Sequence, residues 1–215
     1  ILSDSITTID SYAFSGCSAL ESIKLPSKLK TLGYDFISGT LVTTLTIPAG
    51  LTKCDSSTSY YGPLNGAENL TELILADGME KIPAYLAWFS ASKTTHLTTI
   101  SIPDSVTSIG SYSFANCTAL GEITIPDSVT SIASYAFSGC SRLSSVRWSE
   151  NLQYIGSGSF SNCTALETLS FPKSVKTIDS GAFQGCSSVS SLSFSDNPKG
   201  GFLTDIKNNA FQNCT

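Results

Sequence analysis

Apolar and polar positions follow one another along this chain in a pattern that returns at a fixed interval. From Val106 the sequence reads VTSIGSYSFANCTALGEITIPDS, and three further copies follow. These copies start at Val129, Leu152 and Val175. The cysteines of the four copies are spaced by 23 residues: Cys117, Cys140, Cys163 and Cys186. A fixed period of this length indicates a repeat architecture, in which each unit buries its apolar face only against its neighbours.

Further copies extend the repeat over the whole chain. One begins at Ile6, and the last begins at Leu203 and stops before its second strand. Between the two blocks of regular copies lie three degenerate ones, which begin at Leu29, Leu51 and Met79. We predict a single solenoid over residues 1–215 with about nine repeats, degenerate or expanded at about 29–103. Because the chain lacks an initiator Met and ends inside a repeat, we expect it to be a fragment of a longer protein.

Two segments of each unit have the alternation expected of short β-strands. In the segment L-x-x-I-x-I-P, Ile123 and Ile125 fall on one face, and Pro126 ends the strand because proline donates no hydrogen bond to a sheet. In the segment V-x-x-I, Val106 and Ile109 supply apolar residues for the opposite wall. The pattern predicts a β-rich repeat solenoid with coils of about 23 residues, short parallel strands and little helix.

A phenylalanine follows the V-x-x-I segment in most copies, and we expect these rings to stack as one spine. The spine positions are Phe14, Phe114, Phe137, Phe160, Phe183 and Phe211, with Ile37 and Leu64 in degenerate copies. Two residues further on, eight copies carry only Gly or Asn: Gly16, Gly39, Gly66, Asn116, Gly139, Asn162, Gly185 and Asn213. These residue types tolerate a positive φ, so the sequence predicts a left-handed turn there.

The seven cysteines are predicted to be reduced and structural. Six of them occupy one repeat position, where two degenerate copies carry Thr40 and Ala67. A position that accepts Cys, Thr and Ala is typical of a small buried site, in which a free thiol acts as a small hydrophobe with a weak donor. Cys54 replaces an inward isoleucine and is expected to fill the core. A disulfide between neighbouring coils is the alternative, disfavoured because parallel side chains point the same way.

The composition excludes several classes of function. Only 13% of the residues are charged, against about 25% in typical proteins, while Ser and Thr account for 61 of 215 residues. With a net charge of -5 the chain is not expected to bind nucleic acid, and no apolar run is long enough to cross a membrane. The single histidine, His96, and the lack of a C-x-x-C pair provide no motif for a metal ion or a catalytic triad. We therefore predict a protein without enzyme activity, cofactor or metal.

The unit S/V-x-x-I-x-x-x-A-F-x-G/N-C-x-x-L-x-x-I-x-I-P closely resembles the BspA-like leucine-rich repeat. The match is clearest in the copy at Ile6 and from Val106 onward, and weak between Leu29 and His96. The resemblance implies a leucine-rich-repeat solenoid, wound as a right-handed superhelix, on secreted or surface proteins of host-associated microbes. It further implies an adhesion or protein-interaction module, and it implies no catalytic residues.

Aromatic side chains are the candidates for contact with a partner. Three tyrosines share one position, two residues before the spine: Tyr12, Tyr112 and Tyr135. Tyr85 is a fourth candidate for this position. Later copies carry Gly or Asn there, so tyrosine is not required for folding. Exposed tyrosine contacts a protein or a sugar at low entropic cost, and the alternative is that these rings pack over neighbouring coils.

The two expanded copies add a second group of candidates. Their insertions carry Tyr60, Tyr61, Trp88, Phe89 and His96. Insertions in solenoids map to loops, often on the binding side. The alternatives are that Trp88 and Phe89 fill a core gap left by the missing phenylalanine, and that His96 is an ordinary loop residue.

These observations predict a non-catalytic extracellular protein-interaction or adhesion module. Its partner is expected to be a host or cell-surface protein, and its location extracellular or on the cell surface. The outward strand positions are mostly Ser and Thr, which suits either a plain exposed strand or a broad docking face. Two alternatives remain: a glycan-binding surface module, and a structural spacer with no ligand of its own.

Overall fold

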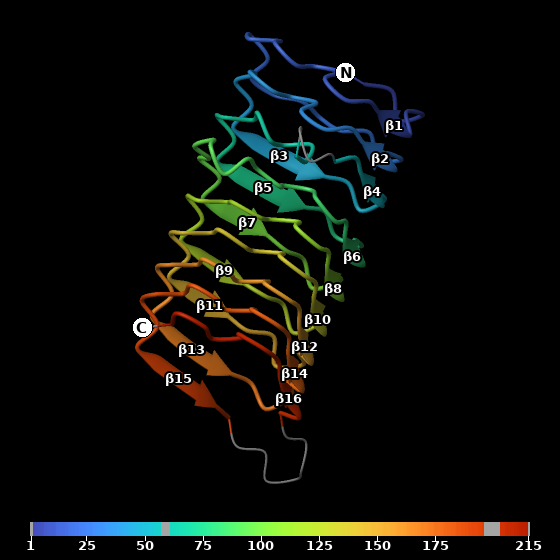
Figure 1. Cartoon of the computed structure of the whole chain (residues 1–215). Helices are drawn as coiled ribbons and strands as arrows, with labels where there is room; N and C mark the ends of the chain where they lie inside the picture. Colours follow the sequence, from blue (N-terminus) through green and yellow to red (C-terminus); the bar gives the residue numbers. More distant parts are fainter. Residues whose placement is uncertain (1, 57–60, 196–202, 215) are drawn as a thin grey trace.

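The computed structural model describes residues 2–56, 61–195 and 203–214. Over these ranges the chain winds into a parallel-strand solenoid of about eight turns, built from strands and turns without a helix (Figure 1). The regular coils advance by 23 residues, as from β8 (Ser108–Ile109) to β10 (Ser131–Ile132). The repeat solenoid expected from the periodicity is therefore confirmed. No helix that could span a bilayer occurs in the described part of the chain.

The strands form two walls, which run along the solenoid in Figure 1. One wall has two-residue strands: β1 (Thr8–Ile9), β2 (Thr31–Leu32), β4 (Lys53–Cys54), β6 (Lys81–Ile82), β8, β10, β12 (Tyr154–Ile155), β14 (Thr177–Ile178) and β16 (Asp205–Ile206). The second wall has longer strands: β3 (Thr44–Ile47), β5 (Glu72–Leu75), β7 (Thr99–Ser101), β9 (Glu122–Thr124), β11 (Ser145–Arg147), β13 (Thr168–Phe171) and β15 (Ser191–Phe194). The two walls correspond to the two strand segments predicted for each repeat.

Every paired strand lies parallel to the strand at the same position of a neighbouring coil. On the first wall Ile109 pairs with Ile132, and Ile132 with Ile155. On the second wall Leu169 pairs with Leu192. This register places equivalent residues in columns, so each inward position becomes a buried column and each outward position a surface column.

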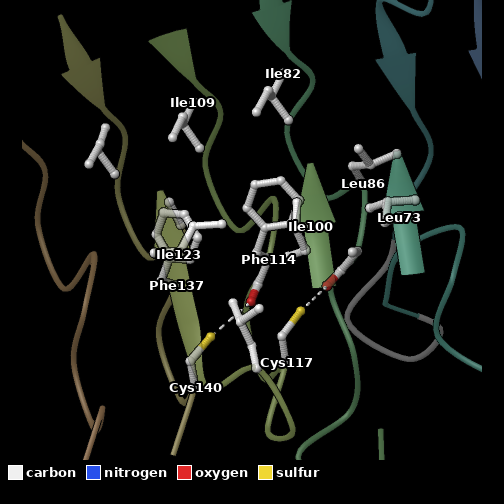
Figure 2. Packing of buried hydrophobic residues seen from close by; sticks show 14 of the residues in the cluster. Leu73, Ile82, Leu86, Ile100, Ile109, Phe114, Cys117, Ile123, Phe137 and Cys140 are labelled. Atoms are coloured by element: carbon white, nitrogen blue, oxygen red, sulfur yellow. Dashed lines mark hydrogen bonds between the residues drawn. The ribbon is translucent and has the colours of Figure 1, made fainter. Parts of the chain in front are cut away.

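The phenylalanine spine is continuous only in the C-terminal half of the solenoid. Its rings, with neighbouring centroids 5.1 to 5.4 Å apart, belong to Phe114, Phe137, Phe160, Phe183 and Phe211. Figure 2 shows the first two of them among the core residues. Phe14 is half-buried and separated from this stack by Ile37, Leu64 and Ala87 at the spine position. The expectation that Phe14 joins one spine is wrong, because the intervening side chains are aliphatic.

The turn after the spine residue is left-handed in seven of the eight copies for which it is predicted. Its φ lies between 59° and 77° at Gly16, Gly39, Asn116, Gly139, Asn162, Gly185 and Asn213. The prediction is wrong for Gly66, whose φ lies outside the left-handed region. Glycine is needed at Gly66 for a different reason, because a Cβ there would overlap the side chain of Ser38 in the preceding coil.

The cysteine column is reduced and, except at its ends, buried. The Cys140 thiol donates to the carbonyl oxygen of Phe114 in the preceding coil at 3.3 Å (Figure 2). The same bond is made by Cys163, Cys186 and Cys214. Burial raises the pKa of Cys186 to about 12, so the group remains a thiol that can donate. Cys54 is buried as expected, whereas Cys17, in the first described coil, is exposed.

Candidate functional site

The position two residues before the spine is left-handed in every repeat except the third, where it is Gly62. Its φ lies between 51° and 67° at Tyr12, Asp35, Tyr85, Tyr112, Tyr135, Gly158, Gly181 and Asn209. In the third repeat the left-handed residue is Tyr61, which lies three residues before Leu64 and has a φ of 58°. Sequence reasoning found the shared tyrosines but missed their conformation, although the Gly and Asn of the later copies were the available signal. This conformation costs an ordinary L-residue about 1–2 kcal/mol, and Gly or Asn adopts it more readily. The chain thus keeps tyrosine in four copies, at a position where smaller residues fit with less strain.

Four of these tyrosines form a continuous row with Trp88. The ring centroids of Tyr85 and Tyr112 are 5.7 Å apart and those of Tyr112 and Tyr135 4.9 Å, both pairs with an interplanar angle of 17°. The Trp88 ring lies 5.5 Å from Tyr85 and 5.1 Å from Tyr112. Tyr61 meets Trp88 at 4.9 Å and 70°. We call these five residues the aromatic ladder.

Neighbouring rings of the aromatic ladder are offset. Aromatic faces in contact lie about 3.5 Å apart. The 4.9 Å between the centroids of Tyr112 and Tyr135 therefore implies a lateral offset of about 3.4 Å. Each stacked ring covers only part of the next. The row ends at Tyr135, which is 38% exposed and lies over Gly158, where a Cβ would overlap its ring.

The aromatic ladder contains no Asp, Glu, Lys or Arg. Burial raises the pKa of Tyr112, and the neighbouring Tyr135 and Tyr85 raise it further, so its phenol stays neutral. The residues directly before the last three tyrosines are uncharged as well: Ala84, Ser111 and Ser134. The aromatic ladder therefore consists of aromatic carbon and hydroxyl groups.

Two of the candidates from the expanded repeats lie apart from the aromatic ladder. Phe89 is 3% exposed and belongs to the core, although it follows Trp88 directly in the sequence. His96 is exposed, and its Nδ1 donates to the backbone oxygen of Glu68 at 2.6 Å. No cluster of three or more His, Cys, Asp or Glu side chains suited to a metal ion occurs in residues 2–56, 61–195 and 203–214.

Tyr12 occupies the column of the aromatic ladder near the N-terminal end of the solenoid. It is 45% exposed, and its ring meets that of Tyr34 edge-on at 5.3 Å. Asp35 fills the same position in the next coil and separates Tyr12 from the ladder. Tyr60 lies outside the described residues. The structure therefore brings together five of the nine candidates.

The repeat unit also matches a known family over nearly the whole chain. Six copies of the family described as BspA type leucine rich repeat region match residues 1–94 and 87–215. The chain belongs to the BspA-type leucine-rich repeat family. No curated protein matches it significantly.

Solved structures share the BspA-type solenoid. A leucine rich repeat protein of T. pallidum is 26% identical, covering 70% of this chain and 72% of that chain, with a TM-score of 0.54. A leucine rich cell surface protein of Faecalibacterium prausnitzii A2-165 is 23% identical, covering 94% of this chain and 61% of that chain, with a TM-score of 0.57. Both are similar to this chain in fold. Leucine-rich repeat solenoids are typically binding scaffolds, and stacked repeats present an extended surface suited to that role.

The outward face of the second wall of this BspA-type solenoid is rich in hydroxyl groups. On β13 and β15, Thr168, Ser170, Ser191 and Ser193 are exposed, and the inward residues of β13 are buried. The Ser193 hydroxyl donates to that of Ser170 at 2.9 Å. Hydrogen bonds between hydroxyl groups thus link these neighbouring coils along a surface column.

A buried carboxylate replaces tyrosine in the second BspA-type repeat. Asp35 is 8% exposed, and its Oδ1 accepts a hydrogen bond from Asn65 Nδ2 at 3.1 Å. The Asn65 oxygen in turn accepts from the Ser90 backbone N–H at 2.8 Å. Burial raises the pKa of Asp35, while the bond from Asn65 and the charge of Lys93 lower it in part.

The Asp35→Asn variant is expected to be more stable than the wild type at pH 7. Because the folded-state pKa of Asp35 lies above its unfolded value of about 3.9, stability falls as pH rises from the unfolded towards the folded pKa and stays lower above it. Asn is neutral at every pH, still accepts the bond from Asn65, and tolerates the φ of 51°. Thermal unfolding should show the gain at pH 7 and its loss near pH 3. A variant less stable at pH 7 would contradict the raised pKa.

Proposed function

We propose that this chain is a non-catalytic extracellular protein-interaction module, which mediates adhesion by binding a host or cell-surface protein through the aromatic ladder. The observation that carries the proposal is the row of Tyr61, Tyr85, Trp88, Tyr112 and Tyr135. Membership in the BspA-type family supports an interaction role.

The backbone strain at the tyrosines supports a role beyond folding. Asn209 holds the same position with a φ of 60°, and Gly158 and Gly181 hold it with φ values of 60° and 63°. A strained residue that persists where unstrained ones also fit is typical of functional sites. We infer that the tyrosine rings are retained for what they contact.

The chemistry of the aromatic ladder suits a protein partner. Tyr and Trp are enriched in protein interfaces, where charged residues are depleted at the centre, and the ladder is uncharged. The rings already hold one another in place, so little side-chain freedom remains to be lost on binding. A sugar ring that stacks on an aromatic side chain needs an open ring face. In the aromatic ladder Tyr85 and Tyr112 partly cover each other's faces, and Tyr112 and Tyr135 do the same. This arrangement favours a protein over a glycan at the ladder.

The extracellular location is part of the same proposal. The F. prausnitzii relative is described as a leucine rich cell surface protein. We extend that location to this chain on the basis of the shared solenoid and of its hydroxyl-rich, weakly charged surface.

The proposal is tested with the double variant Tyr112→Asn/Tyr135→Asn. Asn removes the rings and keeps the left-handed backbone, because Asn209 already does so in this solenoid. The probes are an immobilised panel of extracellular-matrix and serum proteins and, in parallel, a glycan array. We expect the wild type to bind at least one panel protein, and the variant to bind it about 30-fold more weakly, the loss of one interface hot spot.

Tyr154→Phe is the matched control for the loss of a tyrosine group. Tyr154 lies on the first wall, outside the aromatic ladder, and its hydroxyl donates to Asp179 at 2.6 Å. The control should bind like the wild type. Wild-type binding to glycans alone would favour the glycan-binding module. Protein binding that survives in the double variant, or no binding to either panel, would contradict the proposal, and the latter would favour a spacer.

A further inference from the structure

A cleft of about 490 Å³ lies at a corner of the solenoid and includes no residue of the aromatic ladder. Four successive coils form it: Thr71 lies directly before β5, and the other lining residues lie where the next three coils turn into β7, β9 and β11. In the last three of these coils, one repeat position carries His96, Ala119 and Arg142. Because Ala119 is small, it leaves a gap between two longer side chains. Coils stack at about 4.8 Å, so the gap is about two coils wide.

The cleft carries a positive charge without an acidic partner. Its lining contains Arg142 and neither Asp nor Glu. In the described ranges Arg142 takes part in no ion pair. Glu68 lies beside the cleft, where its backbone oxygen accepts the bond from His96, but its carboxylate binds Lys93 at 3.0 Å. The guanidinium of Arg142 therefore remains available for an anion, in a chain whose net charge is -5.

The remaining walls of the cleft are hydroxyl groups. Thr95 Oγ1 and Thr118 Oγ1 lie 3.2 Å apart, and Ser141 follows at the same position of the next coil. Each hydroxyl can both donate and accept a hydrogen bond. Since Nδ1 of His96 donates to the backbone oxygen of Glu68, Nε2 is the ring nitrogen left for a hydrogen bond with a ligand. Ala119 is the only apolar side chain in the lining.

We propose that this cleft binds a carboxylated sugar unit of a glycan. Arg142 holds the carboxylate, and the threonine and serine hydroxyls with His96 Nε2 bond the sugar hydroxyls. The volume falls in the range of about 300–1,000 Å³ typical of small-molecule sites. The carboxylate of one Asp or Glu side chain would leave most of this space empty, so a sugar acid fits better than an acidic peptide. This site is separate from the aromatic ladder and does not depend on the ladder's role.

Titration by NMR with four ligands tests the proposal: glucuronic acid, N-acetylneuraminic acid, glucose and capped glutamate. At least one of the two sugar acids should bind about tenfold more tightly than glucose and capped glutamate. The comparison of the two acids distinguishes a uronic from a sialic acid. The Arg142→Gln variant should lose this preference. The Ala119→Leu variant should weaken the binding of sugar acids, because leucine fills the gap while the charge of the cleft is unchanged.

Arg147→Gln is the matched control, because Arg147 is an exposed arginine of the same coil, on β11, outside the cleft. It should bind sugar acids like the wild type. Three results would overturn the proposal: glucose or capped glutamate binding as tightly as the sugar acids, Arg147→Gln acting like Arg142→Gln, or no sugar-acid binding at about 10 mM. The variants with altered Tyr112 and Tyr135 should bind sugar acids normally, so failure here is distinguishable from failure of the ladder.

Discussion

Replacing Phe160 by alanine is expected to destabilise the solenoid by about 3–5 kcal/mol. The Phe160 ring is fully buried and stacks between Phe137 and Phe183 at 5.1 and 5.4 Å. It also meets Trp148 edge-on at 5.2 Å. The substitution removes these contacts together and leaves a cavity that side chains fixed in adjacent coils fill only in part. Urea unfolding monitored by circular dichroism measures the loss.

The same variant should unfold less cooperatively. In a solenoid each coil contacts only its neighbours, so stability is transmitted through the interfaces between adjacent coils. A weakened central interface should therefore broaden the urea transition. Phe14→Ala is the matched control, because it removes the same ring from a half-buried position outside the continuous stack. Its loss should be clearly smaller, and equal losses would show that the stack contributes no special stability.

The Gly156→Ala variant is expected to lose about 1–3 kcal/mol by overpacking. A Cβ at Gly156 would lie 2.7 Å from the carbonyl carbon of Ala133, 2.8 Å from the Ile132 oxygen and 2.8 Å from the Ser134 nitrogen. All three atoms belong to the backbone of the preceding coil, which cannot move without disturbing the parallel register. A Cβ at Gly110 would likewise lie within 3 Å of backbone atoms of the preceding coil, so the close approach recurs along the first wall. Thermal and urea unfolding measure the effect.

Gly121→Ala makes the same chemical change where there is room for it. No atom lies within 4 Å of a Cβ at this position, and its φ is not in the left-handed region. Alanine there restricts the unfolded chain, so the variant should be neutral or gain up to about 1 kcal/mol. A stable Gly156→Ala, or a Gly121→Ala that loses as much, would contradict the packing argument.

Much of the fold could be predicted because the repeat states each constraint several times. Val106 and Ile109 recur as an apolar pair in unit after unit, and both are buried in the structure. The cysteine column was predictable for the same reason, since Thr40 at the same position showed that the site is small. The prediction was wrong at Gly66 and Phe14, where the repeat is degenerate or lies at the end of the stack.

The sequence predicted which tyrosines share a column but not how their rings are arranged in the aromatic ladder. The spacing of 23 residues between Tyr112 and Tyr135 places them in adjacent coils, but spacing does not determine how the rings turn. Tyrosine is among the residues least suited to a left-handed position, so nothing in its identity pointed to that conformation. The expanded repeats were harder still. Trp88 and Phe89 are adjacent large aromatic residues, yet Phe89 is buried in the core while Trp88 packs on the aromatic ladder. The cleft at Arg142 depends on the small Ala119 of the neighbouring coil, which is informative only in three dimensions.

The left-handed tyrosine position has a consequence for how this protein can change over generations. Its backbone has the same shape whether the coil carries Tyr135, Gly158 or Asn209. The core and this surface position are thereby independent within a single unit, because exchanging the side chain leaves the winding of the coil unaltered. Duplication of a gene segment that encodes one 23-residue unit with its tyrosine would lengthen the aromatic ladder by one ring, and loss of such a segment would shorten it. The reach of the surface can therefore vary in whole steps while the protein continues to fold.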